Sequence, residues 1–194
     1  ADREHWDQTQ KVFAARNLPI LMGYVGDITF PALALPQLLA RLDRGITRAG
    51  TSPAIELQTG IRTLARDFPS LGSFTVYIAH REGYLMRSNF RLSKLSHNAD
   101  VVFSRRWVYE DVPVPTTSSP IVIDGSGKSA VQRISEAWRA EGKDWTSRAI
   151  SSGFIDSIIE GEDWRSGGAP QWGTINRALR RFGGECGFRR GEWW

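Results

Sequence analysis

The chain has 194 residues, of which 41% are hydrophobic and 24% charged, and its formal net charge is +4. This composition is typical of a soluble globular protein. No apolar run reaches the roughly 18 residues that a membrane helix needs, and the polar start is not a signal peptide. Cys186 is the single cysteine, which excludes an intramolecular disulfide, and we expect a reducing, cytoplasmic setting. The histidines form no metal-ligand spacing with it, so no metal or cofactor is predicted.

The first half of the chain predicts two strand pairs with two helices between them. Residues 11–27 contain two apolar runs split by Arg16-Asn17, which predicts a hairpin. Apolar residues at helical spacing predict helices in residues 28–45 and 53–68. Residues 73–90 alternate, turn and alternate again, as a second strand pair does.

Within these helices, Pro36 implies a kink or a later start of the first, and Gly45 or Gly50 can end it. The second helix is predicted to bury an apolar side that consists of Ile55, Ile61, Leu64 and Phe68.

The second half continues with a proline-rich, strand-poor connection over residues 100–120 and a short buried strand over residues 120–125. Two helices follow, with one apolar face each (Val131, Ile134 and Trp138 in the first; Ile150, Phe154 and Ile158 in the second). Residues 167–176 return to a strand. Paired helices between blocks of antiparallel strands predict a layered α+β fold, and no repeat or linker divides the chain.

The segment PIVIDGSGKSAV, residues 120–131, resembles a phosphate-binding loop, with Lys128 after the glycines. Such a loop needs a first glycine five positions before the one that precedes the lysine. Val122 occupies that position, so the loop is too short to wrap a phosphate and an NTPase is not predicted.

Double arginines recur in the segments SRRW, LRRF and FRRG, and eight tryptophans are interspersed along the chain. Such patches can bind nucleic acid. A solvated face is the favoured interpretation, because no nucleic-acid-binding motif accompanies the charge.

Several motifs, taken in order, resemble the proteasome β-subunit and HslV-type peptidases of the N-terminal-nucleophile hydrolases. Asp163, Ser166 and two glycines form the pattern DxxSGG after a helix, and GSG stands at the head of the helix pair. Ala1-Asp2 resembles the end of that family's first hairpin, and Lys11 begins a segment like its lysine-bearing strand. The segment from Gly23 to Leu39 resembles the family's strand, glycine and first helix. The resemblance extends from Ala1 to about Asn176.

The resemblance implies a four-layer αββα sandwich over residues 1–176, in which two antiparallel sheets pack face to face between helix pairs. Residues 177–194 are left as a C-terminal extension of unknown role. The implied function is that of a proteasome-like threonine peptidase subunit that hydrolyses peptide bonds in peptides or unfolded proteins. In this family an N-terminal threonine supplies the nucleophilic hydroxyl, and its α-amine, with a pKa of about 8, acts as the base.

The resemblance also assigns site residues. Lys11 matches the lysine that adds positive potential at the nucleophile, and Asp2 matches the carboxylate that holds this lysine. Gly26 matches the glycine whose backbone N–H stabilises the oxyanion. Each has a simpler interpretation: a solvated lysine, a terminal residue, and a turn glycine beside Asp27 as a helix cap.

Asp163 and Ser166 match the pair that orients the terminal amine. Ser126 lies in the GSG turn, which the resemblance places beside the active site in a supporting role without any phosphate. We predict that Lys11, Asp163 and Ser166 converge on one cleft beside Asp2, with Ser126 near it.

The chain departs from the family at the nucleophile, because it opens with Ala1 and not with threonine, serine or cysteine. The sequence is therefore expected to be a fragment that lacks about one upstream strand, or an inactive relative. A non-catalytic structural subunit of such an assembly is the alternative function, and a basic nucleic-acid-binding domain is the second alternative.

A homo-oligomer, either a ring or a helical array, is expected from the family and from the first helix. Its leucines exceed what one apolar stripe needs (Leu33, Leu35, Leu38, Leu39 and Leu42). Packing of these leucines on the second helix within one monomer is the alternative. An ATPase or another activator is a conceivable partner that the sequence does not identify.

Overall fold

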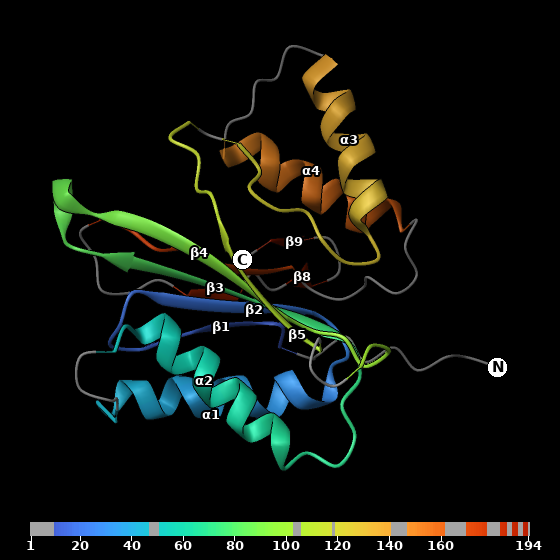
Figure 1. Ribbon diagram of the computed structural model, residues 1–194. Coiled ribbons are helices and arrows are strands. Elements are labelled where there is room, and N and C mark those ends of the chain that lie inside the picture. The colour runs from blue at the N-terminus through green and yellow to red at the C-terminus, as the bar shows by residue number, and fades with distance from the viewer. Residues whose placement is uncertain are drawn as a thin grey trace. The chain divides into compact units, whose positions relative to one another are not determined.

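The computed structural model contains two compact units, which are considered separately (Figure 1). We call the part within residues 10–112 and 171–185 the sheet unit, and the part within 113–170 and 186–194 the helical unit. The predicted domain over residues 1–176 includes most of both units and stays a prediction. The structure describes residues 10–46, 51–102, 106–117, 119–140, 147–161, 170–177, 183–185, 188–189 and 192–193.

The sheet unit contains a five-stranded antiparallel sheet in the order β1-β2-β3-β4-β5. The predicted α+β class and the hairpin within residues 11–27 are confirmed. The second predicted strand pair also exists, but its return strand begins only at Asn89. The short 3-10 helix η1 (Leu85–Arg87) joins β3 to β4. The strands are β1 (Val12–Ala14), β2 (Ile20–Gly26), β3 (Phe74–Glu82), β4 (Asn89–His97) and β5 (Trp107–Val112).

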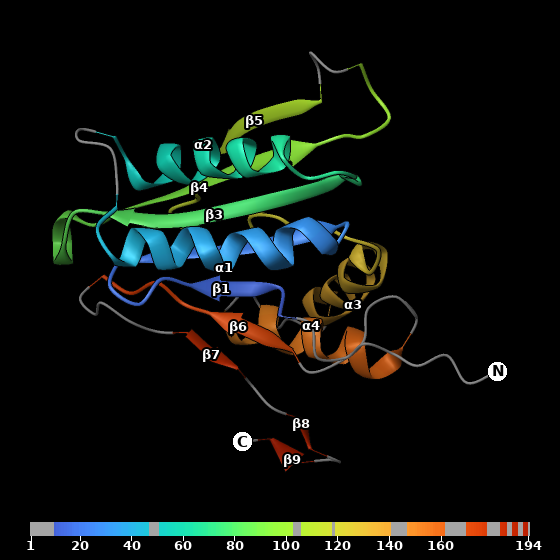
Figure 2. The same cartoon turned by 90° about the horizontal axis from the view of Figure 1, so that it is seen from below.

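One face of this sheet carries the core, because alternate residues of each strand point to the same side. Met22 of β2 pairs with Ile78 of β3, and Tyr24 pairs with Val76, and all four are buried. Helices α1 (Thr29–Asp43) and α2 (Pro53–Arg66) both lie across this face (Figure 2).

Helix α1 begins after Asp27, whose Oδ1 accepts a hydrogen bond from the Thr29 N–H at 2.8 Å. Pro36 lies inside the helix and is exposed, so the predicted later start is wrong. Gly45, which has a φ of 72°, follows the end of the helix as predicted. Four of the five leucines are buried, and Leu33 is 55% exposed, so most of the apolar excess packs within the unit.

Helix α2 is capped by Ser52, whose hydroxyl accepts a hydrogen bond from the Ile55 N–H at 3.4 Å. Its buried side consists of Ala54, Leu57, Ile61 and Ala65, at helical spacing. The prediction that Ile55 belongs to this side is wrong. Ile55 lies one position after Ala54, about 100° around the helix, and is 53% exposed.

Two predictions for the middle of the chain are also wrong. The segment predicted to be strand-poor contains β5. The segment predicted as a buried strand, residues 120–125, has no strand, and its Ile121 and Val122 are 42% and 40% exposed. The backbone groups of this exposed segment can bond to water, so apolarity alone did not produce a strand here.

The helical unit contains α3 (Lys128–Ala140) and α4 (Ser147–Glu160), the predicted helix pair. Arg133 Nη2 lies 2.8 Å from Glu160 Oε2, and the Trp138 indole N–H donates to Asp156 Oδ2 at 3.1 Å. Because later residues of α3 contact earlier residues of α4, the two helices are antiparallel. Short strands β8 (Phe188–Arg189) and β9 (Glu192–Trp193) form a separate ladder.

The sheet unit is completed by a second, small ladder from the end of the chain, formed by β6 (Gln171–Gly173) and β7 (Gly183–Glu185). The strand predicted within residues 167–176 is therefore confirmed. A Cβ added at Gly173 would lie 2.8 Å from Leu21 Cδ2 and 3.3 Å from Val12 Cγ1. By strand alternation these two side chains point away from the face that α1 and α2 cover, so β6 contacts the opposite face.

Candidate functional site

The structure describes three of the six residues assigned to the site. Asp2, Asp163 and Ser166 lie outside the described residues. Lys11 and Gly26 belong to the sheet unit, and Ser126 belongs to the helical unit. The convergence of Lys11, Asp163 and Ser166 therefore stays a prediction. Lys11 and Gly26, the two described site residues of the sheet unit, belong to the β1–β2 hairpin.

Lys11 and Gly26 lie at the same end of this hairpin, the end away from its turn. The Tyr24 N–H donates to the Lys11 carbonyl at 3.3 Å, so these two residues lie opposite each other on neighbouring strands. Gly26 follows two residues later, about 7 Å farther along β2. The Lys11 side chain is exposed.

The backbone direction at Gly26 follows from the alternation of β2. N–H groups of a strand point alternately to its two edges. The Tyr24 N–H points to β1, and the Asp27 N–H donates to the Ser73 carbonyl at 2.9 Å on the other side. The Gly26 N–H therefore points to the edge that faces β1, the edge to which Lys11 belongs.

Gly26 is required at this position for two physical reasons. Its φ is +93°, a conformation that favours glycine. A Cβ would also lie 2.5 Å from the Ser73 carbonyl oxygen and 2.9 Å from the Phe74 Cα. The chain thus holds a bare backbone at this point, tightly against β3.

Tyr24 is a residue of this site that sequence reasoning missed. It is 4% exposed, its ring stacks with Phe13 at 6.4 Å, and its hydroxyl is buried without a hydrogen-bond partner among the described residues. Burial, with the nearby Asp27 carboxylate, raises the pKa of Tyr24 to about 12. In the sequence it is one more alternating apolar residue, so nothing marks the isolated hydroxyl.

We expect Tyr24→Phe to raise the free energy of unfolding by about 1 kcal/mol, because it removes a buried hydroxyl that lacks a partner. Because the pKa of Tyr24 is raised on folding, the folded state favours the protonated phenol. The stability that this pKa difference contributes is fully present below about pH 10 and is lost as pH rises towards 12. Tyr24→Phe should abolish this alkaline loss. Urea unfolding between pH 8 and 12 measures both effects, with the exposed Tyr84→Phe as the control. Equal curves for the wild type and Tyr24→Phe would contradict the assignment.

Gln171 was also missed, and it fixes the start of β1. Its Oε1 accepts hydrogen bonds from the Lys11 N–H at 2.6 Å and the Val12 N–H at 3.1 Å. Gln171 therefore holds Lys11 through its backbone N–H.

Ser126 lies in the turn that begins α3, as predicted for Gly125-Ser126-Gly127. Gly125 has a φ of +103°, and its N–H is held by Asp124 Oδ1 at 2.8 Å. The Lys128 N–H then donates to the Gly125 carbonyl at 3.3 Å. Ser126 is exposed, and its predicted nearness to the cleft stays a prediction.

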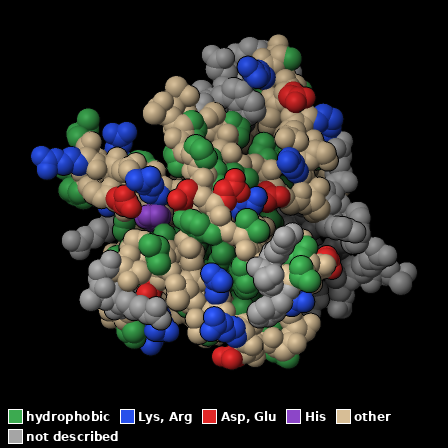
Figure 3. Space-filling model, viewed as in Figure 1, with side chains coloured by type: hydrophobic (Ala, Val, Ile, Leu, Met, Phe, Trp, Pro, Cys, Tyr) green, Lys and Arg blue, Asp and Glu red, His purple; other side chains and the backbone are tan. Residues whose placement is uncertain are grey.

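The described residues bear on the other function classes as well. They contain no cluster of three or more potential metal-binding side chains and no helix with the length and apolarity to span a membrane. On the face seen in Figure 3, acidic and basic side chains are interspersed.

A scan against protein-family models, a search of curated proteins and a search of solved structures found no match.

The function of the hairpin end is therefore inferred from the chemical groups that it presents. It combines an exposed lysine, which supplies positive potential, with a backbone N–H directed to the same strand edge. Such a pair suits the stabilisation of developing negative charge on a nucleophile or an oxyanion.

Proposed function

We propose that this chain is a subunit of a proteasome-like peptidase that hydrolyses peptide bonds through an N-terminal nucleophile. The observation that carries the proposal is the placement of Lys11 and Gly26 at the same end of the β1–β2 hairpin. The family needs these two groups together, beside the nucleophile. Their order in the chain, one on each strand of a hairpin that leads into the first helix, is also that of the family.

In the proposed reaction, the hydroxyl of an N-terminal threonine, or an equivalent serine or cysteine, attacks the peptide carbonyl. The α-amine takes the proton, which is feasible near neutral pH because its pKa is about 8. The positive potential of Lys11 favours the ionised nucleophile, and the Gly26 N–H donates to the oxyanion. The amine of the peptide leaves, and water then hydrolyses the ester or thioester. Asp2, Ser126, Asp163 and Ser166 keep the supporting roles given above.

We further propose the four-layer αββα sandwich as the complete fold. Support comes from the sheet unit, in which two helices cover one face of the sheet while β6 contacts the other. In this proposal the small ladder belongs to the second sheet.

Assembly into a homo-oligomer is part of the proposal. Four leucines of α1 are buried within the sheet unit, so the leucine content of this helix is no longer strong support for an oligomer. The remaining support is a set of exposed apolar side chains on or beside the first two helices (Ile28, Leu33, Ile46 and Ile55). Leu33 and Ile55 are each more than half exposed, at 55% and 53%.

The test compares the chain that begins at Ala1 with the product of its whole coding sequence. We expect the first to be inert, because alanine has no nucleophile, and the second to cleave fluorogenic peptides. Acetylation of the α-amine should abolish that cleavage, because the base is lost. Light scattering of the same preparations gives the size of the assembly.

Two outcomes would overturn the peptidase proposal. Cleavage by the chain that begins at Ala1 would show that the nucleophile is elsewhere. A coding sequence without a threonine, serine or cysteine ahead of a strand would favour the non-catalytic structural subunit.

A further inference from the structure

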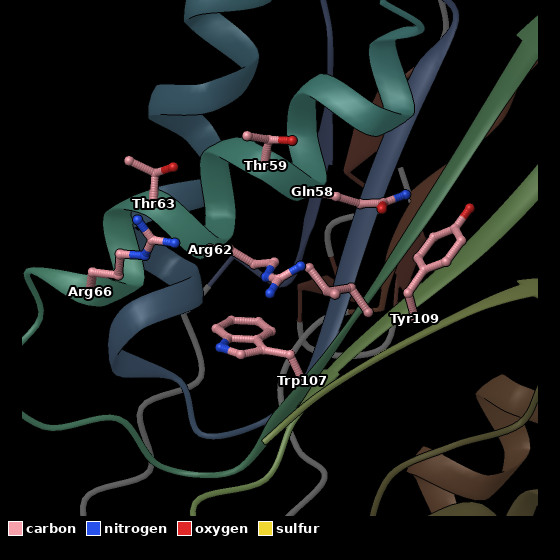
Figure 4. A pocket seen from close by; sticks show the side chains of 8 residues that line it. Gln58, Thr59, Arg62, Thr63, Arg66, Trp107 and Tyr109 are labelled. Atoms are coloured by element: carbon pink, nitrogen blue, oxygen red, sulfur yellow. The ribbon is translucent and has the colours of Figure 1, made fainter. Parts of the chain in front are cut away.

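A cavity of about 260 Å³ lies in the sheet unit between α2 and the strands β4 and β5. It lies away from the hairpin end, because β4 and β5 occupy the opposite edge of the sheet from β1. Figure 4 shows Gln58 and Arg62 projecting from α2 towards the strands, with Arg66 one turn farther along the helix. Trp107 and Tyr109 of β5 face them, and Leu95 of β4 completes the floor.

The charge of this cavity is positive. Arg62 and Arg66 stand four positions apart on one helix face, a spacing at which like charges destabilise a helix. Neither guanidinium has an ion pair among the described residues, and no carboxylate side chain lines the cavity. Arg66 is favourably placed near the helix C-terminus, whereas Arg62 lies before that turn. An anion bound between the two would relieve their repulsion.

The opposite wall is aromatic and fixed in position. The Trp107 ring packs against His97 at 4.8 Å and against Phe74 at 5.9 Å between ring centroids. The hydroxyl of Tyr109 is held by Asp111 and lies 3.1 Å from Ser93 Oγ. An indole and a phenol whose positions are already fixed bind a planar ring with little further loss of side-chain entropy.

Gln58 adds an unsatisfied polar group to the same cavity. Its Nε2 is buried and has no hydrogen-bond acceptor among the described residues. A buried donor without an acceptor lowers stability, so each such group needs an explanation. An acceptor atom on a bound molecule would satisfy it.

We propose that this cavity binds a small molecule in which a planar ring carries a phosphate or carboxylate group. The two arginines hold the anion, the ring lies against Trp107 and Tyr109, and Gln58 donates to an acceptor on the ring. A phosphate and a carboxylate share this chemistry, because guanidinium binds either by paired N–H donors.

Isothermal titration calorimetry at low salt tests the proposal with four probes. Adenosine 5′-monophosphate carries a ring with a phosphate, and indole-3-acetate carries a ring with a carboxylate. Adenosine tests the ring without the anion, and inorganic phosphate tests the anion without the ring. We expect at least one of the first two probes to bind about tenfold or more tightly than adenosine or inorganic phosphate.

Variants then locate the bound probe. Arg62→Gln and Arg66→Gln should each weaken the preferred probe about tenfold and leave the binding of adenosine unchanged. Trp107→Phe, which keeps a ring in place, should weaken both the probe and adenosine. Arg41→Gln removes the same charge from an exposed position on α1 outside the cavity and should change nothing.

Three results would overturn the proposal. They are no binding of either ring-bearing anion at millimolar concentration, inorganic phosphate binding as tightly as the preferred probe, and unchanged affinity in both arginine variants. Because both arginines are exposed, these variants are expected to remain folded, which thermal unfolding checks.

Discussion

Replacing Gly26 with alanine is expected to lower the free energy of unfolding of the sheet unit by about 2–5 kcal/mol. The new Cβ would lie 2.5 Å from the Ser73 carbonyl oxygen, and that oxygen already accepts the Asp27 N–H at 2.9 Å. The Ser73 carbonyl oxygen and the Asp27 N–H both belong to the backbone, so neither can move away without opening the end of the β2–β3 ladder. The positive φ adds backbone strain to this overlap.

Gly45→Ala is the matched control, because it separates the backbone strain of a positive φ from the steric overlap of a new Cβ. Gly45 also has a positive φ, 72°, but a Cβ there would meet none of the described residues within 4 Å. We expect a loss of only about 1 kcal/mol at this position. Urea unfolding of both variants measures the difference, and equal losses would show that the approach of Ser73 to Gly26 relaxes at little cost.

Lys11→Ala in the product of the whole coding sequence is expected to lower kcat for peptide hydrolysis about a hundredfold or more. The lysine charge is proposed to stabilise the nucleophile, so its loss affects the chemical step and leaves the binding of peptide largely unchanged. The strand itself should remain, because Gln171 holds Lys11 through its backbone N–H. Lys11→Arg, which keeps the charge on a longer side chain, should retain part of the activity.

Lys94→Ala provides the control for removing a lysine. Its Nζ lies 3.7 Å from Glu110 Oε2 on the sheet, and an exposed pair of this kind contributes little. We expect this variant to have wild-type kinetics. An equal loss of activity in both variants would indicate a general effect of charge and would remove Lys11 from the proposed site.

The sequence predicted those elements whose pattern is local. The two strand pairs and four helices follow from hydrophobic period and turn residues within about twenty positions. Strand β5 was missed because it lies at the sheet edge and its tyrosine, glutamate and aspartate are exposed, so no buried stripe marks it. Residues 120–125 were misassigned because apolarity without a pairing partner does not make a strand.

The candidate site also has one part that local sequence patterns predict and another part that they do not. The hairpin register brings Lys11 and Gly26 to one end, and a hairpin is predictable from its turn. The role of Gln171 depends on a contact between residues 160 positions apart, which no local pattern indicates. The cavity at β4 and β5 was missed with β5 itself, since Trp107 and Tyr109 belong to that strand.

The long separation of Gln171 from Lys11 has a consequence for the order of events during synthesis. All five strands of the main sheet are complete by Val112, whereas the amide that secures the start of β1 comes from residue 171, which is 160 positions after Lys11. At about 5–20 residues per second, a ribosome needs roughly 8–30 s to cover that interval. The Gln171 hydrogen bonds to Lys11 and Val12 are therefore missing while the rest of the sheet can already form. A peptidase site at this end of the hairpin would be complete only after residue 171 has been synthesised.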